Sequence, residues 1–280
     1  MRILVTGGSG YLGTHVRRFF NADDFSRRAG HDILNSEHVK LVANYDAVIH
    51  LAAYLDKDPD GAELCFRTNA EAVANLVRNL QPNSVFIYAS TKDVYGSNAD
   101  SYAEVPESCP TNYQGQSGLE WSKLIGERYV EYYAGQRNVR ACIFRMSSVY
   151  ARPSEGNENG FVTNYVESVK RRRSIRVPLG GHPIRDILHV EDFSRACRAF
   201  IDSSLAGGLY NLGGGKENAA TLLEIIGSIG NLIHVDPKIV HDDTLPHPVP
   251  VNYVSDLSRI REQLGWRPQI GIEEGLRSLL

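Results

Sequence analysis

The sequence predicts an α/β protein built around a doubly wound parallel sheet, with a smaller C-terminal lobe. Five short apolar segments of strand length recur along the chain, at residues 3–5, 47–49, 85–88, 141–144 and 209–212. Segments with apolar residues at helical spacing separate the first four, and this alternation is typical of parallel strands covered by helices on both faces. Glycines cluster directly after the first strand, where such folds bind phosphate groups.

The glycine-rich segment, residues 7–13, reads Gly-Gly-Ser-Gly-Tyr-Leu-Gly and leads into a helical pattern in which Leu12, Val16 and Phe20 share one face. Glycines permit the sharp turn and let backbone N–H groups approach a pyrophosphate, which the positive end of the helix dipole also attracts. Gly-x-Gly-x-x-Gly alone is a weak signal. Because it lies here between a strand and an amphipathic helix, it predicts a dinucleotide-binding Rossmann domain.

Two further helices and a change of composition divide the rest of the chain. Apolar residues at positions 70, 73, 76, 77 and 80 share one helix face, and residues 121, 125, 129 and 132 share another. Past Tyr150 the chain is rich in glycine, proline and charge, and residues 153–160 indicate a boundary or a mobile loop. We expect a Rossmann domain over residues 1–150, re-entered at about residues 185–215, and a substrate-binding lobe over residues 151–280.

The composition excludes several classes of protein. The chain has 280 residues, of which 42% are hydrophobic and 22% are charged, as is ordinary for a globular protein. Its formal net charge of −3 gives no general attraction to nucleic acid or to anionic membranes. No segment reaches the about 20 apolar residues of a membrane span, and the first residues lead into a strand without a cleavable signal. We therefore expect a cytoplasmic protein without nucleic-acid or membrane partners.

Cysteine and histidine spacing predicts neither disulfides nor a metal site. The four cysteines lie far apart without a Cys-x-x-Cys pair, so we expect reduced thiols. His234, His241 and His247 lie in and before a proline-rich segment and lack the close spacing of metal ligands. No bound metal is expected.

The segments that follow the strands resemble those of the extended short-chain dehydrogenases/reductases, the NAD(P)-dependent nucleotide-sugar epimerase/dehydratase family. The resemblance rests on six segments in the family's order: residues 6–13, 50–53, 90–96, 185–192, 210–213 and 264–268. It implies a set of cofactor-binding residues, namely Gly7, Gly10, Tyr11, Leu12, Gly13, Leu51, Ala52, Ala53 and Lys123. It also implies a homodimer formed through a pair of helices from each subunit, the helix around Trp121 among them.

The catalytic pair of that family is Tyr-x-x-x-Lys, two residues on one helix face. Ser122, Lys123 and Glu127 reproduce the family's Ser-Lys-x-x-x-Glu. The resemblance therefore implies that Lys123 holds the nicotinamide ribose and lowers the pKa of the tyrosine, which exchanges a proton with the sugar hydroxyl. Here Leu119 stands at the tyrosine's position. Since leucine exchanges no proton, three alternatives stay open: the chain binds ligands without turnover, another group transfers the proton, or the reaction needs none.

Three more residues complete the expected reacting site. Thr91 matches the family position whose hydroxyl bonds the reacting oxygen of the substrate. Asp93 matches an acidic residue of the sugar dehydratases, but Lys92 stands where the dTDP-glucose dehydratases have a second acid, so the dehydratase set is incomplete. Tyr113 lies in a loop whose glycines would let it fold back, which makes it our candidate for the missing phenol. Its alternative role is that of a partly buried loop aromatic.

Arginines indicate where anionic groups bind. Arg185 matches the family's contact with the nucleotide diphosphate, and Arg152 is a second candidate for the same group, since a guanidinium suits phosphate oxygens. NAD sites usually present an acid at the end of the second strand, whereas a 2′-phosphate calls for arginine. At that place the chain has Arg27 and Arg28 after a serine. NADP is therefore favoured over NAD. 

The adenine contact and the overall activity complete these expectations. Asp32 and Ile33 resemble the family motif that contacts adenine. We expect an NAD(P)-dependent epimerase or ketoreductase that transfers hydride at a ring carbon of a nucleotide sugar. The alternative is a catalytically silent protein of the same fold that binds the cofactor and the nucleotide sugar.

Overall fold

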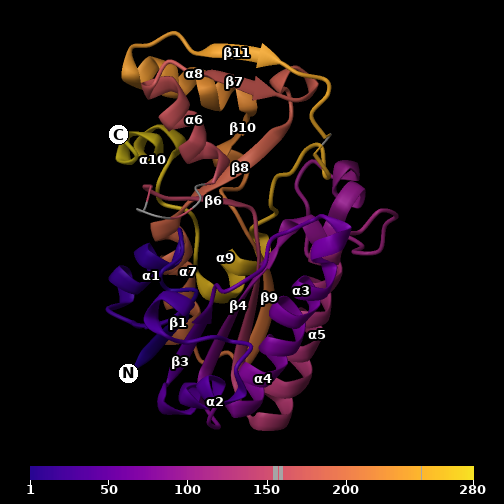
Figure 1. Ribbon diagram of the computed structural model, residues 1–280, viewed down its shortest axis with the longest axis vertical. Coiled ribbons are helices and arrows are strands. Elements are labelled where there is room, and N and C mark those ends of the chain that lie inside the picture. Colours follow the sequence, from indigo (N-terminus) through magenta and orange to yellow (C-terminus); the bar gives the residue numbers. More distant parts are fainter. Residues whose placement is uncertain (154–156, 158–159, 247) are drawn as a thin grey trace.

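The computed structural model describes residues 1–153, 157, 160–246 and 248–280. Most of the predicted boundary segment, residues 153–160, and His247 therefore lie outside the described residues. A large sheet with its helices forms one part of the molecule, and smaller sheets with other helices form the second part (Figure 1).

The large sheet has six parallel strands in the order β2-β1-β3-β4-β5-β9. The strands are β1 (Ile3–Thr6), β2 (Asp23–Phe25), β3 (Ala47–His50), β4 (Val85–Thr91), β5 (Arg140–Met146) and β9 (Gly207–Leu212). All five predicted apolar segments lie in strands of this sheet. No apolar run in the sequence predicted β2, because its first two residues are carboxylates and only Phe25 is buried.

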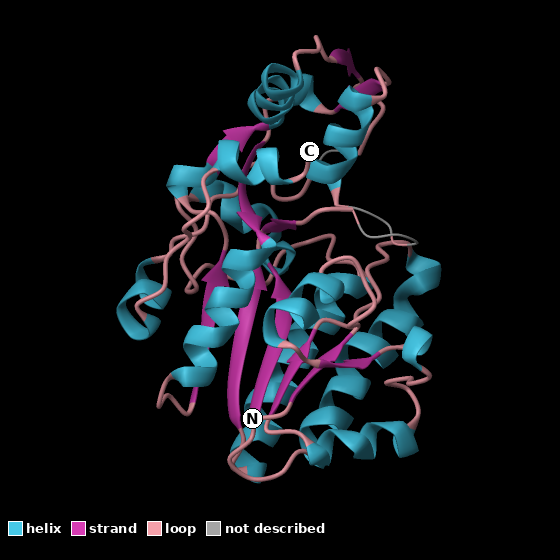
Figure 2. Ribbon diagram, turned by 90° about the vertical axis from the view of Figure 1, so that its left-hand side faces the viewer, coloured by secondary structure: helices cyan, strands magenta, loops and turns pink. Residues whose placement is uncertain are grey.

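Helices cover both faces of the large sheet, as Figure 2 shows. One face carries α1 (Gly13–Phe20) and α7 (Val190–Asp202), and the other carries α3 (Ala62–Phe66), α4 (Ala72–Asn79) and α5 (Gly118–Arg137). Neighbouring strand residues point to opposite faces, so Val5 packs in the core beneath α1 and α7 while Leu4 packs beneath α4. This two-sided burial explains the apolar runs of β1, β3 and β4.

The second part of the molecule holds two small sheets. One has the order β10-β8-β6 and the other pairs β11 with β7. Its elements are β6 (Ser148–Tyr150), α6 (Phe161–Lys170), β7 (Ser174–Val177), β8 (Ile184–His189), β10 (Ala219–Thr221), α8 (Leu222–Ile233), β11 (Lys238–His241) and α10 (Ile272–Ser278). Because α7 and β9 follow β8 and return to the large sheet, the two parts are interleaved in sequence.

Short helical segments complete the fold. They are η1 (Arg27–Ala29), α2 (Ser36–Val39), η2 (Lys40–Asn44), η3 (Pro59–Gly61), the π-helical turn η4 (Arg67–Glu71), η5 (Lys92–Ser101), η6 (Leu179–Gly181), η7 (Lys216–Asn218) and α9 (Ser258–Leu264). A single-residue bridge between Arg185 and Tyr253 and another between Val105 and Ser255 join the C-terminal segment to both parts. Within the described residues, every helix is too short or too polar to span a bilayer.

The fold class agrees with the prediction. The parallel order of the sheet, its two helical layers and the smaller second part are those of a Rossmann-type, doubly wound α/β protein.

Candidate active site

The glycine turn packs directly on the chain that leaves β3. Gly7 has a φ of +68°, and a Cβ atom built on it would lie 2.8 Å from the backbone nitrogen of Ala52. A Cβ on Gly13 would lie 2.1 Å from the Gly7 carbonyl oxygen. The Thr6 hydroxyl accepts the Ala52 N–H at 3.2 Å. Glycine is therefore required for both the turn conformation and the close approach of the two segments.

His50 supports this contact from within the sheet. Its Nδ1 lies 2.6 Å from the Thr6 hydroxyl oxygen, and its ring stacks with those of Phe86 and Tyr88 on β4. Complete burial lowers the pKa of His50 to about 3, and the Lys123 charge acts in the same direction. His50 is therefore a neutral structural residue that holds the glycine turn against β3.

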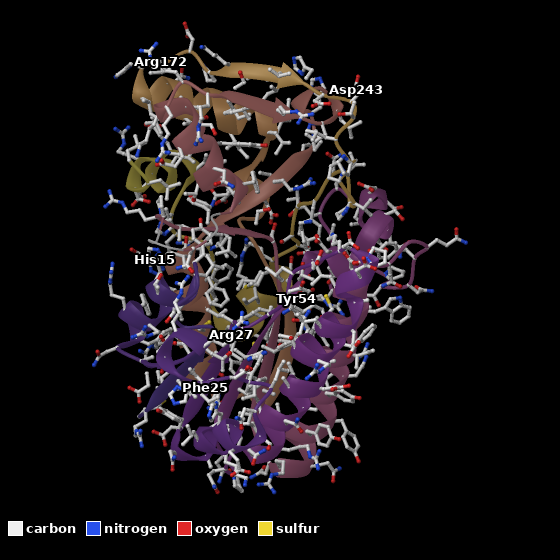
Figure 3. All side chains as sticks on the ribbon, viewed as in Figure 1. His15, Phe25, Arg27, Tyr54, Arg172 and Asp243 are labelled. Carbon is white, nitrogen blue, oxygen red and sulfur yellow. The ribbon has the colours of Figure 1, made fainter. Side chains whose placement is uncertain are left out.

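A cavity of about 360 Å³ opens beside the turn. It brings together nine of the predicted cofactor residues: Gly7, Gly10, Arg27, Arg28, Asp32, Ile33, Leu51, Ala52 and Ala53. Phe25, Arg27 and Tyr54 mark its position in Figure 3. Backbone of the glycine turn and the arginines of η1 both line it.

Tyr11, Leu12 and Gly13 do not line this cavity. The Tyr11 hydroxyl lies 2.9 Å from the Ala151 carbonyl oxygen and 2.7 Å from the Thr163 hydroxyl, which ties the glycine turn to α6. Burial raises the pKa of Tyr11, so its hydroxyl stays protonated. In this structure the tyrosine of the turn joins the two parts of the molecule.

The end of β2 carries hydroxyls and cations. The carboxylate of Asp24 binds the Ser9 hydroxyl and lies 3.0 Å from the guanidinium of Arg17. The Ser26 hydroxyl donates to the Ser9 oxygen at 2.9 Å, and Arg28 donates to the Ser9 carbonyl at 3.0 Å. Asp24 is thus bound within the protein, and Ser26 lines the cavity at the place where NAD-binding turns usually present an acid.

The predicted reacting residues meet where β4 approaches α5. Thr91 ends β4, and its hydroxyl oxygen accepts the Asp93 N–H at 3.1 Å. Lys123 is 4% exposed and donates to the Ala89 carbonyl at 2.7 Å. Burial lowers the pKa of Lys123 to about 8, although the Glu127 charge raises it. Leu119, one turn earlier on α5, is 5% exposed, so an apolar side chain fills the place of the expected phenol.

Glu127, one turn after Lys123, lies in a buried network. Its carboxylate accepts two hydrogen bonds from Arg145 on β5, at 2.6 and 3.0 Å, and one from Ser90 on β4, at 2.5 Å. The network therefore ties α5, the helix that carries Lys123, to two strands of the sheet.

Tyr113 lies beside the site but is held by the backbone. Its hydroxyl donates to the Asp93 carbonyl at 3.3 Å, and its ring covers Gly96 so closely that a Cβ there would lie 2.2 Å from it. Burial, together with the Glu120 charge, raises the pKa of Tyr113 to about 12. A catalytic phenol in this family needs the opposite shift, because it must exchange its proton near neutral pH.

A cluster of four charged side chains lies beside Thr91. The Lys57 amine lies 2.9 Å from Asp93 and 2.8 Å from Glu120, and the Lys92 amine lies 2.6 Å from Asp93. Burial opposes the charge on Asp93, but the two lysines hold its pKa well below the usual range. Sequence reasoning missed Lys57 and Glu120, because neither residue belongs to a motif and their elements meet only in the fold.

Asn69 is a third residue that sequence reasoning missed. It lies in the π-helical turn η4, is fully buried, and binds the backbone of Tyr54 through both amide atoms. Its Nδ2 also donates to the Ser122 hydroxyl at 3.0 Å. A buried asparagine within an otherwise apolar helix face is the signal that would have found it.

The two arginines proposed for a diphosphate lie in different places. Arg185 on β8 donates to the carbonyl oxygens of Ile184, Pro250 and Val251, at 2.6, 3.1 and 2.7 Å, and is 8% exposed. These bonds use three of the five guanidinium N–H groups. Arg152 donates to the Ser278 carbonyl and lines a separate cavity beside α1.

Comparison with known proteins identifies the family. The sequence profile of the NAD dependent epimerase/dehydratase family matches residues 3–213. The chain belongs to this family, which confirms the resemblance drawn from the motifs.

Two curated relatives cover nearly the whole chain. The dTDP-glucose 4,6-dehydratase of Mycobacterium tuberculosis is 28% identical over 317 residues, covering 100% of this chain and 92% of the relative. The CDP-paratose 2-epimerase of Salmonella typhi is 26% identical over 333 residues, covering 100% and 98%. Dehydratases and epimerases of nucleotide sugars are thus both similar to this protein.

Solved structures agree on the fold. The UDP-glucose 4-epimerase of Thermotoga maritima, with UDP-glucose, superposes with a TM-score of 0.86 at 22% identity, covering 99% of this chain and 97% of that one. The UDP-glucuronic acid 4-epimerase of Bacillus cereus, with UDP-glucuronic acid and NAD, gives a TM-score of 0.83 at 21% identity, with the same coverage. At these identities the likeness establishes the fold alone.

Proposed function

We propose that this protein is an NAD(P)-dependent epimerase or ketoreductase that acts by hydride transfer at a ring carbon of a nucleotide sugar. The observation that carries the proposal is the buried Lys123, which lies one turn after Leu119 on α5 and donates to the Ala89 carbonyl of β4. The names of the similar proteins, which include epimerases and dehydratases of UDP-, CDP- and dTDP-sugars, support the substrate class.

The residues around the glycine turn fit a dinucleotide. Gly7 and Gly10 permit the tight turn that would bring backbone N–H groups to the pyrophosphate, and Tyr11 and Leu12 lead into α1, which begins at Gly13. The remaining contacts would come from Asp32, Ile33, Leu51, Ala52 and Ala53, with Lys123 at the nicotinamide ribose. When bound, the nicotinamide supplies or accepts the hydride.

NADP is our preferred cofactor. Ser26 replaces an acid at the end of β2, Asp24 is bound by Arg17 and Ser9, and Arg27 and Arg28 line the same cavity. A 2′-phosphate would meet two guanidinium groups there and no carboxylate from β2.

Substrate contacts are assigned to Thr91, Asp93 and Arg185 at the opposite end of the site and to Arg152, which lies apart from them beside α1. The Thr91 hydroxyl has a proton to donate to the reacting oxygen, because its oxygen already accepts the Asp93 N–H. Asp93 would bind a sugar hydroxyl. Arg185 retains two N–H groups for the diphosphate, and Arg152 is a second candidate. Tyr113 stays a candidate proton donor only if its hydroxyl leaves the Asp93 carbonyl.

A catalytically silent binding protein is the second candidate function. Leu119 favours it, because this residue is 5% exposed and brings no proton to the site. The same cofactor and nucleotide sugar would then bind without turnover.

The proposal also covers the oligomeric state and the cellular location of the protein. We propose a homodimer through the outer face of α5, where Trp121 is 48% and Tyr132 is 61% exposed. The four cysteines are free thiols, which supports a reducing compartment, the cytoplasm.

One experiment separates these functions. The purified protein is denatured, and any released dinucleotide and nucleotide sugar are identified by mass spectrometry. Turnover is then measured with UDP-glucose, UDP-glucuronic acid and dTDP-glucose. An enzyme converts at least one of these sugars, whereas a silent protein binds cofactor and sugar and converts none. Failure to bind any dinucleotide would contradict both candidates.

A further inference from the structure

Lys92 is a buried cation directly after Thr91. It begins η5 and is 8% exposed. Its amine lies 2.6 Å from one carboxylate oxygen of Asp93 and 5.4 Å from the ring centroid of Tyr253. An ammonium group has three N–H donors. Among the described residues, Asp93 supplies its one hydrogen-bond acceptor, so two donors remain available.

The surroundings of Lys92 disfavour its charge. Asp93, which attracts it, is shared with Lys57 from the chain after β3. Arg185 from β8 adds a repelling cation, and Tyr253 contributes only a neutral ring, because burial keeps its hydroxyl protonated. Burial lowers the pKa of Lys92, with Arg185 acting in the same direction and Asp93 opposing. A buried ammonium with two open donors is stabilised by a ligand that accepts them.

The other proton-bearing side chains near Thr91 are already engaged. Lys57 binds two carboxylates, which together raise its pKa despite its burial. Tyr113 donates to a backbone carbonyl and has a raised pKa. Lys123 donates to Ala89, and its other two donors are those that the proposed function assigns to the nicotinamide ribose. Within the part of the chain that the structure describes, Lys92 combines open donors with a lowered pKa.

We propose that Lys92 contacts the reacting sugar oxygen and exchanges the proton that Leu119 cannot. The inference rests on the proposed function. In the reducing direction, a hydride from the reduced cofactor adds to the carbonyl carbon while an N–H bond of the Lys92 ammonium breaks and its proton forms the hydroxyl. The ketone is reduced, the cofactor is oxidised, and the neutral amine regains a proton from water. In the oxidising direction, the neutral amine of Lys92 is the base that accepts the proton of the sugar hydroxyl. Asp93 lies beside Lys92 in both directions.

Two substitutions test this role. Lys92→Met keeps the length of the side chain and removes the amine, whereas Lys92→Arg keeps the charge on a group that does not release its proton near neutral pH. We expect both to slow single-turnover reduction of bound cofactor by UDP-glucose, UDP-glucuronic acid or dTDP-glucose by ~10²- to 10⁴-fold. The wild-type rate should fall as pH drops and Lys92 becomes protonated, and this dependence should be absent in both variants.

Controls separate catalysis from structure. Lys238→Met removes an exposed lysine of β11 and should keep the wild-type rate. NADP titration should give unchanged affinity in all variants, which establishes that they are folded. Adding Leu119→Tyr to Lys92→Met should restore part of the lost rate.

Four results would contradict the proposed role of Lys92 or the proposed function. A wild-type rate in Lys92→Arg would reduce Lys92 to a positioning cation, and a wild-type rate in Lys92→Met would remove it from the reaction. Loss of activity in Tyr113→Phe alone would assign the proton to Tyr113. A wild-type protein that binds NADP and reduces it with none of the three sugars would overturn the proposed function itself.

Discussion

The cofactor end and the reacting end of the site are held together by different means. At the cofactor end, glycines bring backbone against backbone, as in the contact between Gly7 and Ala52. At the reacting end, charged side chains from separate elements meet: Lys57, Lys92, Asp93 and Glu120. Backbone contacts depend on the absence of side chains and tolerate little change. A cluster of side chains can be rearranged one residue at a time, and Leu119, at the position where the motifs predict a tyrosine, lies at this end.

The largest effect is expected from restoring the phenol. Leu119→Tyr places a hydroxyl one turn before Lys123, whose charge lowers the pKa of a neighbouring phenol. A positioned general acid or base contributes ~10²- to 10⁴-fold. Because Lys92 is proposed to supply the proton in the wild type, the gain is expected in Lys92→Met, where adding Leu119→Tyr should raise turnover of a nucleotide sugar by up to that factor. Steady-state turnover of Lys92→Met with and without Leu119→Tyr gives the comparison. The idea fails if the double variant binds cofactor and sugar as Lys92→Met does yet gains no rate.

The network beneath Lys123 should dominate the stability of the reacting end. Glu127→Ala leaves the Arg145 guanidinium buried without its carboxylate, which costs about 3–5 kcal/mol of the free energy of unfolding. The matched control is Glu131→Ala, which breaks the exposed pair with Arg128 and costs about 0–1 kcal/mol. Urea unfolding measures both. Equal losses in the two variants would show that burial of the Arg145 pair is unimportant.

The residues predicted for the cofactor end lie together in the fold because their signals are local in sequence. The glycine turn, the residues after β3 and the η1 arginines each follow a strand at a fixed distance, and nine of the predicted residues line one cavity. Tyr11 shows the limit of this reasoning. Its bonds to Ala151 and Thr163 join residues 140 and 152 positions apart, which no local pattern indicates.

At the proposed reacting end, the sequence indicates only the residues that belong to a motif. Thr91 and Lys123 follow from motifs, and the structure places both beside the end of β4. Lys57 and Glu120 carry no such signal, since their ion pair exists only because α5 packs near the segment after β3. The bonds of Arg185 to Pro250 and Val251 likewise depend on how the C-terminal segment returns.

Arg185 tests whether the reacting end binds the diphosphate. Arg185→Ala should weaken nucleotide-sugar binding by about 1.5–3 kcal/mol, the range for hydrogen bonds to charged groups, and leave dinucleotide affinity nearly unchanged. Calorimetric titration of the wild type and Arg185→Ala with the nucleotide sugar and with the dinucleotide measures both affinities. Because Arg185 also holds the carbonyls of Pro250 and Val251, an equal loss for both ligands would indicate a folding defect.

The smallest effect tests the cofactor end. If Arg27 and Arg28 receive a 2′-phosphate, NADP should bind at least about tenfold more tightly than NAD, and Arg27→Ala should weaken NADP by about 1.5 kcal/mol while sparing NAD. Ser26→Asp, which supplies the acid missing at the end of β2, should lower NADP affinity through charge repulsion and give the ribose 2′-hydroxyl of NAD an acceptor. Calorimetric titration with NAD and with NADP measures the dissociation constant of each cofactor for the wild type and both variants. Tenfold tighter binding of NAD by the wild type would reverse the preference, and the arginines would then be a solvated rim of the cavity.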